Sequence, residues 1–69
     1  MDPHELKRLE RFLRKTFANQ QLRVAAQNKK TDSAELYIGE EFLGVIYKDV
    51  DEGELSYNLS IPILDIDLD

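Results

Sequence analysis

The stretch SAELYIGEEFLGVIY, residues 33–47, decides the fold of this 69-residue chain. Residues 34–38 alternate apolar with polar side chains, which is the period of a strand with one covered face. Residues 39–41 then predict a short hairpin turn, because Gly39 can adopt a positive φ. Residues 42–47 are apolar on both faces, which is typical of a central strand. The stretch therefore predicts an antiparallel pair at the centre of a sheet.

A helix is expected before the sheet. Its apolar stripe recurs at helical spacing and consists of Leu6, Leu9, Leu13 and Phe17, with Phe12 on the flank. Asp2 suits the N-cap and Pro3 the first helical position, while Glu5 completes a capping box with Asp2. Asn19 is the expected stop, because Asn tolerates the left-handed conformation that ends many helices.

Further strands are expected on both sides of the central pair. Residues 22–27 alternate like a half-covered strand, and the polar turn 28–33 joins them to the hairpin. An acidic turn at 49–54 precedes another alternating strand over 55–63. Short connections favour antiparallel neighbours. The sequence thus predicts an α+β fold, with one N-terminal helix packed on a four-stranded antiparallel β-meander, in a single domain of residues 1–69.

The alternation slips by one residue at 63–64, near the C-terminus. Pro62 cannot donate a ladder hydrogen bond, so we expect a bend or bulge here, with Pro62 on an edge or at the break. Beyond the slip, Asp65, Asp67 and Asp69 would all point to one side of a strand. Such carboxylates would protect an exposed edge or meet a basic partner; weak binding of a divalent cation is the alternative.

Composition narrows the function classes. The chain has no cysteine, which excludes disulfides, thiolate zinc sites and cysteine nucleophiles. The net charge of −5 is unevenly divided: residues 1–30 carry eight Lys/Arg and three Asp/Glu, whereas residues 31–69 carry one Lys and eleven Asp/Glu. This split predicts two faces of opposite sign, which would serve internal complementarity, attraction between copies, or a polarised surface for a partner.

A resemblance to a family of proteins rests on three stretches: the strand-turn-strand stretch 33–47, the acidic turn 49–54 and the ending ILDIDL at 63–68. Together they resemble a family of alphaproteobacterial proteins of about this length that is described only as a domain of unknown function. The resemblance implies a bacterial cytosolic protein of unassigned role. It implies no catalytic or binding residues.

Candidate catalytic and metal-binding residues are few. His4 is the only histidine, and no nucleophile or orienting group accompanies it in the sequence. The acidic turn resembles the start of a calcium loop, but Gly53 is fifth rather than sixth and Ser60 stands at the twelfth position, where a Glu is needed. We therefore expect no enzyme, no metal site and no cofactor.

The basic residues of the helix offer one binding surface. Arg8, Arg11, Arg14 and Lys15 could contact phosphates, so a nucleic-acid or anionic-ligand binder is the alternative function. The acidic net charge argues against it, because nucleic-acid-binding domains are usually basic.

The sheet offers a second binding surface. One helix cannot cover both faces of four strands, so we expect an open face that carries Tyr37, Leu43 and Val45, and Tyr47 and Tyr57 are expected to pair across a hairpin. The predicted function is a non-catalytic protein-interaction module that self-associates as a homodimer or binds another protein, with contributions from Asp65 and Asp67. No stretch is long enough to span a membrane, so a cytoplasmic location is expected.

Overall fold

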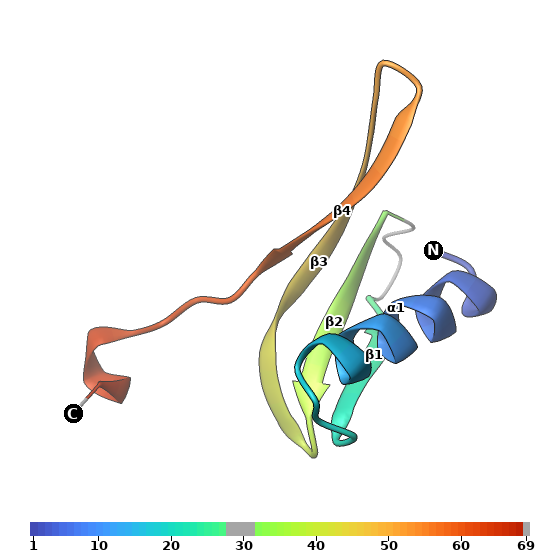
Figure 1. Cartoon of the computed structure of the whole chain (residues 1–69). Coiled ribbons are helices and arrows are strands. Elements are labelled where there is room, and N and C mark those ends of the chain that lie inside the picture. Colours follow the sequence, from blue (N-terminus) through green and yellow to red (C-terminus); the bar gives the residue numbers. More distant parts are fainter. Residues whose placement is uncertain (28–31, 69) are drawn as a thin grey trace.

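The computed structural model describes residues 1–27 and 32–68. Its elements follow the chain in the order α1 (Pro3–Thr16), β1 (Leu22–Ala26), β2 (Ser33–Ile38), β3 (Glu41–Asp51), β4 (Glu54–Ser60) and the short 3-10 helix η1 (Asp65–Asp67). The four strands form one antiparallel sheet in the order β1-β2-β3-β4, with α1 packed on one face (Figure 1). The predicted α+β meander is therefore confirmed.

The core lies between α1 and the sheet. It consists of Leu13 from the helix and Leu22, Ala34, Leu36 and Ile46 from the first three strands. The strand register explains why these strand residues are buried together. Ala34 of β2 pairs with Ile46 of β3, and Leu36 lies on the same face of the sheet as both. Only five apolar side chains are fully buried in the described residues. The core is as thin as expected of a chain this short.

The helix begins as predicted but ends differently. The Asp2 carboxylate accepts from the Glu5 N–H at 2.7 Å, and the Glu5 carboxylate accepts from the Asp2 N–H at 3.3 Å, which completes the capping box. At the other end, Ala18 with a φ of 51° adopts the left-handed conformation that the sequence predicts for Asn19. The Asn19 N–H donates to the Arg14 carbonyl at 3.0 Å, as in a Schellman motif.

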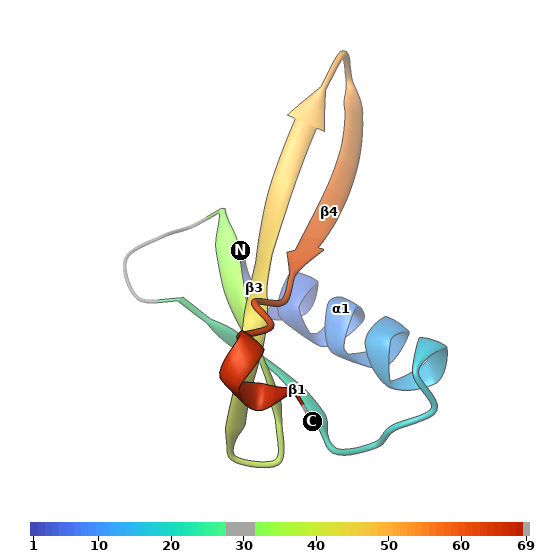
Figure 2. The same cartoon turned by 90° about the vertical axis from the view of Figure 1, so that its left-hand side faces the viewer.

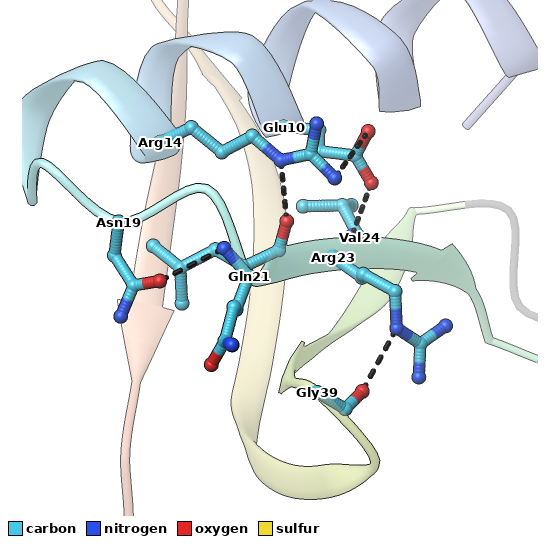
Figure 3. Close-up of polar contacts among 8 residues, drawn as sticks. Glu10, Arg14, Asn19, Gln21, Arg23, Val24 and Gly39 are labelled. Carbon is cyan, nitrogen blue, oxygen red and sulfur yellow. Dashed lines mark hydrogen bonds and ion pairs between the residues drawn. The ribbon is translucent and has the colours of Figure 1, made fainter.

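Side chains of α1 hold the sheet edge formed by β1 (Figure 3). The Arg14 Nε donates to the Leu22 carbonyl at 2.7 Å, and the Glu10 carboxylate accepts from the Val24 N–H at 3.0 Å. Glu10 and Arg14 also pair with each other at 3.5 Å. These contacts satisfy backbone groups on the outer side of an edge strand, and they obstruct pairing with a further strand there.

The turns are shorter than the sequence indicated. Gly39 adopts the expected positive φ of 60°. The acidic turn consists only of Glu52 and Gly53, both with positive φ, because β3 runs on to Asp51. Residues 28–31 of the predicted polar turn lie outside the described residues, while Ser33 is buried within β2 rather than in the turn.

The irregularity in the sheet lies at Leu43, not after Pro62. Leu36 pairs with Gly44 and Tyr37 pairs with Phe42, so Leu43 is the extra residue of a bulge in β3. Pro62 is not in the ladder at all, since β4 ends at Ser60. The end of β4 passes so close to Gly44 of β3 that a Cβ at residue 44 would overlap the Ser60 carbonyl oxygen.

The end of α1 generates a stability prediction. Ala18 holds a conformation that is unfavourable for a residue with a Cβ, whereas Gly adopts it freely. We expect Ala18→Gly to raise the free energy of unfolding by about 0.5–1 kcal/mol, measured by urea denaturation. Ala25→Gly, in the extended backbone of β1, is the control and should lower stability by a similar amount. A loss of stability in both variants would contradict the assignment.

Candidate interaction surfaces

A polar cluster fixes the start of α1 against the β3–β4 hairpin. The Lys48 Nζ lies 2.7 Å from a Glu5 carboxylate oxygen, and the Tyr57 hydroxyl donates to the same oxygen at 2.5 Å. The hydrogen bond from Lys48, then that from Tyr57, lowers the pKa of Glu5 to about 2, and the same contacts raise the pKa values of Lys48 and Tyr57. The cluster is therefore an ionised anchor between the helix and the hairpin.

Tyr57 belongs to this helix-facing side of the sheet, whereas Tyr47 lies on the other side. In the register of β3 and β4, Tyr47 pairs with Asn58 and Tyr57 pairs with Lys48. Consecutive strand residues point to opposite faces, so the predicted pairing of Tyr47 with Tyr57 is wrong.

The sheet face opposite α1, called the open face below, is not covered by any described element (Figures 1 and 2). The strand register assigns to it Arg23, Ala25, Glu35, Tyr37, Phe42, Val45 and Tyr47. Phe42 and Tyr47 keep 45% and 50% of their surface exposed, and Val45 lies between them on β3. This face therefore presents the apolar and aromatic side chains of Phe42, Val45 and Tyr47 along β3.

Contacts within the open face hold Tyr37 in place. Its ring meets the Phe42 ring edge-on, with centroids 5.8 Å apart, and the Arg23 guanidinium lies 5.1 Å above its centroid. The Tyr37 hydroxyl donates to the Glu35 carboxylate at 2.9 Å, and this hydrogen bond raises the pKa of Tyr37. The aromatic strip is thus preorganised, which reduces the entropy that any binding partner must overcome.

Leu43 is not part of the open face. As the bulge residue of β3 it packs against the core beside α1, where it lines a hollow of about 310 Å³ together with Phe17 and Ile61. The bulge breaks the simple alternation of β3, so a count by twos from Val45 puts Leu43 on the wrong side. Val45 and Tyr37 do lie on the open face.

A second apolar surface lies beside the helix. The helix-side groove, as we call it, separates α1 from the β3–β4 hairpin and is lined by Leu9, Phe12, Leu13, Ile46, Tyr57 and Leu59. Phe12 is 63% exposed at its rim. The groove opens into a hollow of about 200 Å³ bordered by Arg8. The sequence placed Phe12 on the flank of the helix stripe, which was the only sign of this groove.

A third surface is the C-terminal arm, residues 61–68. It leaves β4 on the side of the sheet opposite α1 and projects away from the rest of the chain (Figures 1 and 2). Its large apolar side chains are all exposed: Ile61, Ile63, Leu64, Ile66 and Leu68. Asp65 and Asp67 lie in η1 rather than on a strand, so the prediction that they share one side of a strand is wrong. Asp69 lies outside the described residues.

The helix cations divide into two groups. Arg14 is held against β1 by its contacts with Leu22 and Glu10. Arg8, Arg11 and Lys15 are exposed. Arg8 and Lys15 lie four residues before and three residues after Phe12, so they flank it along the rim of the helix-side groove.

The described residues hold no cluster of side chains arranged to bind a metal ion. No group of three or more His, Asp or Glu side chains within 1–27 and 32–68 is arranged to hold a metal ion. His4 is exposed near the helix start. Among the helices of the described residues, none combines the length and the apolarity needed to cross a membrane.

The fold and its surfaces define a small α+β protein in which a single helix covers part of one face of a four-stranded meander. A family model described as "protein of unknown function (DUF3126)" matches residues 5–67, and the chain belongs to this family. Neither the curated proteins nor the solved structures contain a match to the chain.

The Glu5 cluster generates a pH prediction. Because the pKa of Glu5 falls from 4.5 to about 2 in the folded protein, its ionised contacts stabilise the fold above pH 4.5, and this stabilisation is lost as the pH falls toward 2. We expect Glu5→Gln to be less stable than the parent at neutral pH, with the difference shrinking through that window. Urea unfolding at a series of pH values measures it.

The matched control for this measurement is Glu54→Gln, on the exposed end of the β3–β4 hairpin. Its stability should run parallel to that of the parent protein across the same pH range. A Glu5→Gln deficit that stays constant down to the lowest pH would contradict the role of the ionised carboxylate.

Proposed function

We propose that this protein is a non-catalytic interaction module that self-associates through the open face of its sheet. The observation that carries the proposal is the strip of Phe42, Val45 and Tyr47 along β3, held beside Tyr37 on a face that no described element covers. Exposed apolar patches on small domains usually mark interfaces. Full burial of one large apolar side chain contributes about 1.5–3 kcal/mol, so the strip can support stable association.

Three features favour a second copy as the partner. The charged side chains of the open face, Arg23 on β1 and Glu35 on β2, are both engaged by Tyr37 within the chain, so a second copy can cover the face without pairing them. The arm projects on this same side, where a copy seated on the open face would be within its reach (Figures 1 and 2). A thin core with no disulfides would also gain stability from association.

The setting we propose is the cytoplasm of a bacterium, as the resemblance to an alphaproteobacterial family suggests. The cysteine-free sequence is compatible with a reducing compartment.

The alternative is binding of nucleic acid or another polyanion by the exposed helix cations. Arg8, Arg11 and Lys15 support it, but Arg14 already serves the fold through its contact with Leu22. Salt separates the two functions. Phosphate contacts weaken steeply as salt rises, whereas an apolar interface does not.

Light scattering coupled to size exclusion tests self-association. We expect a dimer at low and high salt, and we expect the double variant Phe42→Ser, Tyr47→Ser to raise the dimer dissociation constant by about tenfold or more, because it removes most of the exposed strip. Val50→Ser is the matched control, since Val50 is 65% exposed and lies on the opposite face of β3. A monomer at every salt concentration would contradict the proposal, as would an equal effect of the control.

A further inference from the structure

We propose that the C-terminal arm of one copy binds in the helix-side groove of a second copy, so that two chains exchange arms. The inference rests on the proposed self-association and adds to it a receiving site and an inserted segment. The open face remains the main contact between the sheets, and the arms reach around it to the partner's helix.

The arm has the character of a segment that is covered by something other than its own chain. Ile63, Leu64, Ile66 and Leu68 are 59–86% exposed, although they follow directly on a well-formed strand. A run of four large exposed apolar residues is unusual on a soluble domain. Ile61 at the start of the arm lies against Gly44 and lines the hollow beside Phe17, and the rest of the arm projects from the sheet. The projecting arm and the β3–β4 hairpin together give a radius of gyration of 12.7 Å, where about 11 Å is typical of a compact domain of this length.

The groove has the complementary character. Leu9, Phe12 and Leu59 give it an apolar floor and rim, and Tyr57 closes one end. Its hollows of about 70 and 200 Å³ are open to solvent and offer room for aliphatic side chains such as those of the arm. No described residue of the same chain fills them.

Charge favours this pairing. The arm intersperses its aliphatic residues with Asp65 and Asp67. The groove is bordered by the exposed Arg8, and helical spacing places the exposed Lys15 on the same side of α1 as Phe12. An apolar segment with acidic positions therefore meets an apolar groove with a basic rim. The open face is a poorer receiver, because Glu35 lies on it and its cation Arg23 is already engaged over Tyr37.

The length of the arm permits exchange. Its eight residues could reach about 26 Å when extended. A sheet stacked face to face lies about 10 Å away, and the helix layer beyond that sheet adds about 10 Å. The arm already leaves on the side where that copy would sit, and away from the groove of its own chain (Figures 1 and 2).

The absence of native cysteine permits a direct test by disulfide trapping. Phe12→Cys and Leu68→Cys, at the far end of the arm, are prepared as separate full-length proteins, mixed and mildly oxidised. We expect a crosslinked dimer that contains one copy of each variant, identified by mass spectrometry, because a disulfide forms only when the two Cβ atoms approach to about 4 Å. Lys7→Cys, exposed on the same helix away from the groove, and Tyr47→Cys, on the open face, replace Phe12→Cys as matched controls.

Each outcome of the trapping is decisive. Crosslinking of Leu68→Cys to Phe12→Cys above the level of both controls supports arm exchange. Preferred crosslinking to Tyr47→Cys would overturn it in favour of an arm on the open face. A disulfide formed only within one chain, in a monomeric Phe12→Cys, Leu68→Cys double variant, would show instead that the arm folds back. No crosslink above the Lys7→Cys background also overturns it.

Charge reversal provides a second readout. We expect Asp65→Lys, Asp67→Lys and, separately, Arg8→Glu, Lys15→Glu to raise the dimer dissociation constant by about tenfold, and an equal mixture of the two proteins to form a mixed dimer more tightly than either forms alone. No preference for the mixed dimer would contradict the pairing. If the Phe42→Ser, Tyr47→Ser protein dissociates but trapping fails, only arm exchange is wrong; if trapping succeeds while that variant stays dimeric, only the open-face contact is wrong.

Discussion

The single 14-residue helix is too narrow to cover one whole face of the four-stranded sheet. A helix with its side chains is about 10 Å wide, whereas four strands about 4.8 Å apart make a sheet nearly twice as wide. The helix lies closest to β1, so the half of the sheet formed by β3 and β4 is left partly bare on the helix side and the whole opposite face is bare. Both the helix-side groove and the open face follow from this one geometric limit.

The position of the helix is set by polar contacts as much as by the core. Arg14 and Glu10 bind the outer backbone of β1, and Glu5 binds the β3–β4 hairpin through Lys48. These contacts fix the helix at both ends of its span while the few buried aliphatic residues fill the space beneath it. Because removal of one partner from a charged, partly buried pair leaves the other unsatisfied, such anchors specify the docking angle more strictly than apolar contacts do.

The sequence predicted the elements that follow a regular hydrophobic period and missed the residues at which that period is interrupted. Periodicity located the helix and the strands, and residue chemistry located the capping box at Asp2 and the turn at Gly39. The bulge at Leu43 interrupts the period of β3 without a Gly or Pro at that residue, so Leu43 was assigned to the wrong face. Ala18 at the helix end likewise adopts a conformation that its residue type disfavours. The 3-10 turn at Asp65 is a conformation that residue propensities do not determine. The groove was invisible because it depends on where the helix docks, which no local pattern encodes.

The arm gives a physical meaning to the uneven charge of the chain. An aliphatic segment such as ILDIDL without its aspartates would promote indiscriminate association, since five to seven uncharged β-prone residues are an aggregation signal. Asp65 and Asp67 keep the exposed segment soluble, and they also restrict its partners to surfaces that are basic as well as apolar. In this protein such a surface exists beside Phe12, where Arg8 and Lys15 border the groove. The proposed arm exchange would use this charge distribution, because basic residues are concentrated in the helix, acidic residues are concentrated at the other end of the chain, and the arm leads away from its own helix.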